Sequence, residues 1–124
     1  MTINNSFFSN RRSVTAKKMT ANPINPEDLE IILAAGIRVP DHGALNPWKL
    51  VVIQGSRLKE LDEEVILSEF KKDNQNASQS EIEIESTRLQ RGGVVIAVLS
   101  IPIDHPKIPV WEMQLSSGAV CMNL

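Results

Sequence analysis

Arg38-Val39-Pro40-Asp41-His42 is followed closely by Asn46-Pro47-Trp48. A proline pushes the residue before it out of the helical region, so the helix that precedes this stretch should end before Val39. The residues from Pro40 to Pro47 should then form a loop, and loops at the ends of rigid elements often carry binding groups. The guanidinium, imidazole and indole of this stretch suit a flat, charged ring. The stretch therefore predicts a binding loop.

Arg11-Arg12-Ser13 lies upstream of this loop. Two adjacent guanidiniums and a hydroxyl can bind phosphate in a forked geometry that lysine cannot reproduce. Taken alone, such a charged pair is more often a solvated turn, here one that follows a short helix containing Phe7 and Phe8. The loop downstream reverses that preference, because the two clusters together suit an anionic, aromatic cofactor.

A third stretch, Lys107-Ile108-Pro109-Val110-Trp111-Glu112, is followed by Ser116-Ser117-Gly118-Ala119. Together with the two clusters it resembles the nitroreductase family of FMN-dependent oxidoreductases, most closely its short bacterial subgroup. The resemblance runs from about Ser6 to Leu124 and thins between Leu58 and Arg91. It implies an α+β, nitroreductase-like fold with a central sheet flanked by helices, in which the third stretch opens the long core helix.

The same resemblance assigns roles to the cofactor-binding residues. Arg11 and Ser13 should contact the phosphate or ribityl end of FMN, with Arg12 beside them. Arg38 and His42 should approach the flavin from the partner subunit, because in this family the FMN site lies at the interface of a homodimer. No catalytic side chain is expected, since the flavin carries the chemistry.

The activity implied by the resemblance is electron transfer from NAD(P)H, as co-substrate, to a small-molecule acceptor. That acceptor would be nitroaromatic or quinone-like, and the mechanism ping-pong. The family continues beyond the core helix, so we expect residues 1–124 to form a single, incomplete domain that is truncated at its C-terminal end. The alternative is a truncated, catalytically inactive module that binds flavin or dimerises.

Length and charge restrict the other possibilities. A chain of 124 residues is large enough for one domain with a core, and its formal net charge is -2. Four cations, Arg11, Arg12, Lys17 and Lys18, lie close together but without interleaved aromatic residues, so nucleic acid is not an expected partner. The longest apolar run, Val94–Ile101, is far shorter than the roughly twenty residues that span a bilayer, so a membrane is not expected either.

The single cysteine and the N-terminus indicate the compartment. Cys121 cannot form an internal disulfide and lies in an apolar stretch, which predicts a buried thiol in a reducing compartment. The first six residues are polar and lack the basic start and apolar run of a secretory signal. A cytoplasmic protein is therefore expected.

The remaining chain predicts both helices and strands. Residues 82–91 fit a strand, because Ile82 and Ile84 alternate with glutamates, or a helix that stops at Gly92-Gly93. The polar run Lys71–Ser80 predicts a mobile loop or lid rather than core. The other expected elements are a helix from Pro26 capped by Asn25, a strand over Leu50–Gln54, a helix capped by Ser56, a strand over Val94–Ile101 and a helix over Trp111–Leu124.

Two Asp-His pairs raise the question of a metal site. Asp41-His42 and Asp104-His105 lie far apart in the sequence and show no recognised ligand spacing, so no metal is expected. Asp41-His42 could instead form a local turn hydrogen bond, which is common for aspartate after proline.

A hydrolase site is not expected. Ser116 and Ser117 lie in a helix of small residues and His105 in a proline-rich loop, and no acid completes a triad with them. Trp48 and Trp111 are expected to pack in the core or at an interface, given the large area that an indole buries.

Overall fold

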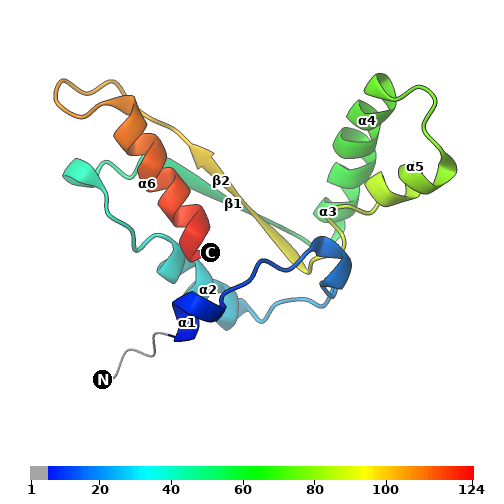
Figure 1. Ribbon diagram of the computed structural model, residues 1–124, viewed down its shortest axis with the longest axis horizontal. Coiled ribbons are helices and arrows are strands. Elements are labelled where there is room, and N and C mark those ends of the chain that lie inside the picture. Colours follow the sequence, from blue (N-terminus) through cyan, green and yellow to red (C-terminus); the bar gives the residue numbers. More distant parts are fainter. Residues whose placement is uncertain (1–5) are drawn as a thin grey trace.

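The computed structural model describes residues 6–124 of the chain (Figure 1). Helices and a two-stranded antiparallel sheet combine in an α+β arrangement, as predicted. The helices and helical turns are α1 (Ser6–Asn10), η1 (Ala16–Lys18), α2 (Pro26–Gly36), η2 (His42–Ala44), α3 (Ser56–Leu61), η3 (Asp62–Ile66), α4 (Leu67–Asp73), α5 (Gln79–Glu85) and α6 (Val110–Asn123). The strands are β1 (Trp48–Gln54) and β2 (Val94–Ser100).

Strands β1 and β2 form a long ribbon along which the other elements are arranged. Trp48 lies opposite Ser100 at one end, and Gln54 lies opposite Val94 at the other. Helix α6 packs on β2 and on α2, whereas α3 follows β1 directly at the second end. Figure 1 shows α4 and α5 projecting as a helical hairpin beyond that end. The ribbon thus separates a body of α2 and α6 from a distal hairpin.

Helix α2 begins and ends as the sequence predicts. The Asn25 side chain accepts a hydrogen bond of 3.0 Å from the N–H of Glu27. Pro26 occupies the first helical position, where its missing N–H is not needed. The strand predicted over 94–101 and the helix predicted over 111–124 are also confirmed, each to within one residue at either end.

The loop predicted over Lys71–Ser80 is confirmed only for residues 74–78, which are non-helical and mostly exposed, so its predicted bounds are too wide and its mobility stays a prediction. Helix α4 continues to Asp73 and α5 begins at Gln79. The Ser78 hydroxyl accepts a hydrogen bond of 3.3 Å from the N–H of Glu81, and the Glu81 carboxylate accepts one of 2.8 Å from the N–H of Ser78. This reciprocal capping box explains the polar composition, which marks the start of a helix.

Residues 82–91 are helical at their start, which confirms the helix over the strand. The expected end of this helix at the glycine pair is wrong, because α5 ends at Glu85 and turns follow. The fully buried carboxylate of Asp62 accepts hydrogen bonds from the N–H of Leu89 at 2.8 Å and of Gln90 at 3.1 Å. Asp62 therefore supplies the acceptors that a longer helix would have supplied.

Two smaller predictions are also wrong. Gly55, not Ser56, is the N-cap residue of α3, and its φ of 62° is a left-handed value that favours glycine. Cys121, expected to be a buried thiol, is exposed. The buried positions of α6 include Ser117 and Val120, and Cys121 lies about 100° further around the helix.

Candidate functional site

The segment between α2 and β1 forms the predicted loop, called here the binding loop (Pro40–Pro47). The Asp41 carboxylate accepts a hydrogen bond of 2.7 Å from the N–H of Asn46, which closes the loop on itself. The local turn bond considered as an alternative for Asp41 is therefore present, with the N–H of Asn46 as its donor. Asn46 has a φ of 48°, a left-handed conformation that asparagine adopts more readily than most residues.

Two hydroxyl groups of α6 hold the two ends of the binding loop. Ser116 Oγ donates to the carbonyl of Pro40 at 3.0 Å, and Ser117 Oγ donates to the carbonyl of Pro47 at 3.0 Å. Each hydroxyl also lies within hydrogen-bond distance of a carbonyl one turn back in α6, so its proton is shared. Both serines are buried. Sequence reasoning found no role for them, because their partners lie some seventy residues away.

His42 makes a direct contact with α6. Its Nδ1 lies 2.7 Å from Oε2 of Glu112, and the side chains are 63 % and 28 % exposed. The pair borders a shallow hollow of about 330 Å³. Besides this pair, the hollow is lined by Pro40, Leu115, Ser116 and Ala119. The partner of His42 was not predicted, although Glu112 belongs to a stretch that the sequence singles out.

Arg38 lies where α2 passes into the binding loop. Its carbonyl accepts a hydrogen bond of 3.1 Å from the side-chain amide of Asn123, near the end of α6. Its side chain is exposed. The main chain is thus held while the guanidinium stays accessible, four residues before His42. The contact of Arg38 and His42 with a flavin stays a prediction.

The Arg11-Arg12-Ser13 cluster directly follows α1. Arg11 Nη1 donates to the hydroxyl of Ser13 at 3.4 Å, and Arg12 Nη1 donates to the carbonyl of Arg11 at 2.8 Å. All three residues are exposed. Within residues 6–124 no hydrogen bond or ion pair links this cluster to Arg38 or His42. Each cluster is therefore held locally.

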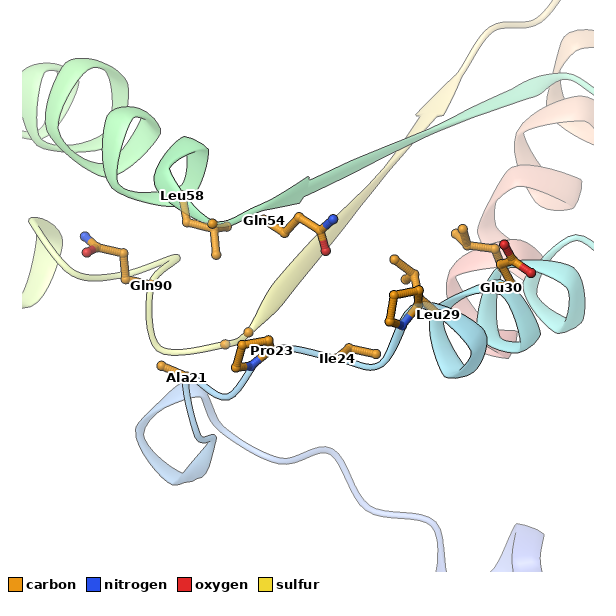
Figure 2. A pocket seen from close by; sticks show the side chains of 13 residues that line it. Ala21, Pro23, Ile24, Leu29, Glu30, Gln54, Leu58 and Gln90 are labelled. Carbon is orange, nitrogen blue, oxygen red and sulfur yellow. The ribbon is translucent and has the colours of Figure 1, made fainter.

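A larger hollow of about 800 Å³ lies at the opposite end of the ribbon from the start of β1. Figure 2 shows Pro23, Ile24 and Leu29 on one side of it and Gln54 and Leu58 on the other. None of the five cofactor-binding residues predicted from the sequence lines it. The hollow was not predicted, because it depends on how the segment before α2 crosses the ends of both strands.

Gly93 allows that crossing. The carbonyl oxygen of Asn22 lies 1.7 Å from the position that a Cβ at Gly93 would occupy. Any side chain there would displace the segment before α2. Glycine is therefore required at this position, because the two main chains approach closely. One glycine of the pair that was expected only to end a helix therefore has a packing role.

Three further features bear on the remaining predictions. Residues 6–124 contain no group of three or more histidine, cysteine, aspartate or glutamate residues arranged to hold a metal ion. No helix in the described part of the chain is long and apolar enough to cross a membrane. Trp111 is 60 % exposed, so of the two expectations for it, core packing is wrong and interface packing stays a prediction.

The chain is similar in sequence and in structure to known proteins. The profile of the nitroreductase family matches residues 8–124. The chain is 32 % identical over 108 residues to a Haemophilus influenzae protein named "Putative NAD(P)H nitroreductase". It is 30 % identical over 120 residues to the Escherichia coli protein named "Putative NAD(P)H nitroreductase YdjA".

The coverage of these matches is unequal. They include 87 % and 93 % of this chain, but only 58 % and 60 % of the two relatives. The fold is also similar to the crystal structure of a nitroreductase-like family protein from Bacillus cereus, with a TM-score of 0.75 and 22 % identity. That match covers 99 % of this chain and 64 % of the other.

Proposed function

The chain belongs to the nitroreductase family, and we propose that it acts in an FMN-dependent oxidoreductase. Electrons would pass from NAD(P)H to a nitroaromatic or quinone-like acceptor by a ping-pong mechanism. The observation that carries the proposal is the family match over residues 8–124, which includes both cationic clusters. The chain spans about three fifths of the length of its relatives, so their activity is extended to it as a proposal.

The first cluster fits the phosphate end of FMN. Arg11 and Arg12 are exposed guanidiniums, and the hydroxyl of Ser13 lies 3.4 Å from Arg11. A phosphate dianion accepts hydrogen bonds from guanidinium and hydroxyl groups. Two adjacent arginines can bind it through paired hydrogen bonds. We assign Arg11, Arg12 and Ser13 to the phosphate or ribityl end.

The second cluster would act across a homodimer interface. Arg38 is exposed just before the binding loop and His42 is exposed on it, and α6 holds this segment in place, so both residues can reach a ligand bound by another subunit. An exposed apolar face of α6 supports such an interface. Trp111, Leu115 and Met122 are 60 %, 65 % and 72 % exposed and share one side of the helix.

The protein's part in the reaction is binding and orientation. FMN, when bound, would accept hydride from NAD(P)H and deliver electrons to the acceptor. Arg11 and Arg12 would hold the anionic end, while α6 would hold the main chain at Arg38, through Asn123, and near His42, through the Ser116 bond to Pro40. No side-chain nucleophile is assigned, because this chemistry does not require one.

The test is the visible absorption spectrum of the purified chain after FMN has been added and the excess removed. Retained flavin bands, and their bleaching by NADH or NADPH without oxygen, are the expected results. A colourless protein would contradict the proposal for this chain. Static light scattering on the same sample should give a dimer mass.

A second candidate is a module that binds flavin or dimerises without turnover. The observation that favours this candidate is that the chain matches only 58–60 % of the length of its two relatives. This module would retain the flavin bands, or the dimer mass alone, but nicotinamide would not bleach the flavin. The same sample therefore separates the two candidates.

A further inference from the structure

The contact between His42 and Glu112 constrains the proton on the imidazole. A carboxylate can only accept hydrogen bonds, and His42 Nδ1 lies 2.7 Å from Oε2 of Glu112. The ring nitrogen at that distance must therefore carry the proton. In a neutral imidazole the other nitrogen, Nε2, is then an acceptor.

We propose that Glu112 is a positioning residue that holds neutral His42 in the Nδ1–H tautomer, with Nε2 left to accept a hydrogen bond from a ligand. This inference rests on the proposed function for the identity of the ligand, but not for the tautomer itself. It would give His42 a defined role at the candidate site.

The carboxylate is well placed to act on the ring. Glu112 lies in the first turn of α6, where a negative charge interacts favourably with the helix dipole. Its side chain is only 28 % exposed, so the contact is partly shielded from water. The neighbouring bond from Ser116 to the carbonyl of Pro40 fixes the loop two residues before His42. Both partners are thus held by the fold.

His105 provides an internal comparison. Its Nδ1 accepts hydrogen bonds from the N–H of Ile108 at 3.1 Å and of Lys107 at 3.3 Å. A nitrogen that accepts from the main chain carries no proton, so neutral His105 should have its proton on Nε2. The two histidines of the chain should therefore be opposite tautomers.

The tautomer decides which part of a ligand neutral His42 can recognise. An Nε2 acceptor pairs with an O–H or N–H donor, and FMN offers such donors on its ribityl chain and at N3 of its ring. A phosphate dianion has no proton to donate. We therefore assign neutral His42 to the ribityl or ring part of FMN, and the phosphate to the guanidinium cluster.

The experiment reads the tautomers directly, without FMN. A chain labelled with 15N in its histidine rings is examined by long-range proton–nitrogen NMR at about pH 9, well above the ordinary imidazole pKa of about 6.5. The variant His105→Gln assigns the signals. Nδ1–H as the major form of His42, with Nε2–H at His105, is the expected result. Nε2–H as the major form of His42 would overturn the inference.

Variants test the cause. In Glu112→Ala, His42 should change to a majority of Nε2–H, whereas Gln114→Ala, an exposed position on the same helix, should leave it unchanged. An unchanged His42 in a folded Glu112→Ala would refute the role of Glu112. If that variant does not fold, Glu112→Gln serves instead, because its amide can accept or donate and should reduce the Nδ1–H fraction. Flavin binding is scored separately, so its failure would remove the proposed function and leave the tautomer result standing.

Discussion

Ser117 Oγ donates a hydrogen bond of 3.0 Å to the carbonyl of Pro47, and both side chains are buried. The same carbonyl also accepts the N–H of Ile101 at 2.8 Å. One carbonyl at the end of the binding loop therefore joins α6, the start of β1 and the end of β2.

Replacement of Ser117 by alanine should lower the free energy of unfolding by about 1 kcal/mol, because Pro47 keeps one of its two donors. Urea denaturation measures this change. Ser80→Ala, at an exposed position, should stay within about 0.5 kcal/mol of the parent. Equal stability of the two variants would contradict the anchoring role of Ser117.

Asp62→Ala should be more damaging. The carboxylate accepts three hydrogen bonds from Gln90 and Leu89 main-chain N–H groups and a fourth from the Gln90 side chain. Donors left without a partner near a buried site should cost about 3 kcal/mol in total. Glu63→Ala, which truncates an exposed neighbouring carboxylate, is the control for urea unfolding. A loss below about 1 kcal/mol for Asp62→Ala would show that water replaces the carboxylate.

Gly93→Ala and Gly118→Ala should have opposite effects. A Cβ at Gly93 would collide with the main chain of Asn22, at a cost of about 1–3 kcal/mol. A Cβ at Gly118 meets nothing within 4 Å, and alanine in a helix interior is favoured over glycine by up to about 1 kcal/mol. Thermal unfolding of both variants measures the difference. Similar melting temperatures would argue against the close approach at Gly93.

The capping box predicts a dependence on pH. Hydrogen bonds from the hydroxyl and then the N–H of Ser78 hold the pKa of the Glu81 carboxyl below its ordinary value. The stabilisation is therefore present above the unfolded-state pKa and is lost as the pH falls through the lowered pKa of the folded state. In Ser78→Ala the pKa of Glu81 should rise toward its ordinary value in a carboxyl 13C titration. An unchanged pKa would contradict the cap.

The phosphate assignment predicts weaker FMN binding by Arg11→Ala and Ser13→Ala. A lost charged hydrogen bond costs about 1.5–3 kcal/mol, so the Kd for FMN should rise roughly 10- to 150-fold in Arg11→Ala. Arg57→Ala, which removes an exposed arginine paired with Glu60, is the matched control. Quenching of flavin fluorescence measures each Kd. Unchanged affinity in both site variants would refute the assignment.

His42 and Arg38 require a different design, because their predicted contact crosses the subunit interface. A mixed dimer of one Arg11→Ala and one His42→Ala subunit should retain one intact site, whereas either variant alone should have two weakened sites. Flavin stoichiometry near one per mixed dimer is the expected result. The absence of any tight site would show that the contacts lie within one subunit, and two tight sites would show that neither Arg11 nor His42 contributes to flavin binding.

Local signals in the sequence predicted the helices and strands whose formation depends on residues close together in the chain. The start of α2 is marked by the Asn25 cap and Pro26. Its end is marked, to within a few residues, by the proline after Val39. The dense β-branched run beginning at Val94 predicts β2 for a similar reason. These features need no knowledge of distant contacts.

Contacts between distant residues could not be predicted in this way. Asp62 meets Leu89 across 27 positions, and Ser117 meets Pro47 across 70. A buried acceptor or hydroxyl has no periodicity that would identify its partner. The capping box at Ser78 is a different case, because its local signal was present and the polar composition around it was given more weight.

The anchoring of the binding loop also affects when the loop can form during synthesis. Its holding groups, Glu112, Ser116 and Ser117, follow their partners by 70 to 76 residues. At 5–20 residues per second a ribosome adds that length in roughly 4 to 15 s. During that interval the residues of the binding loop would already be synthesised, but the side chains of α6 that hold its conformation would not. Under the proposed function, flavin binding through this loop should therefore begin only after α6 has left the exit tunnel.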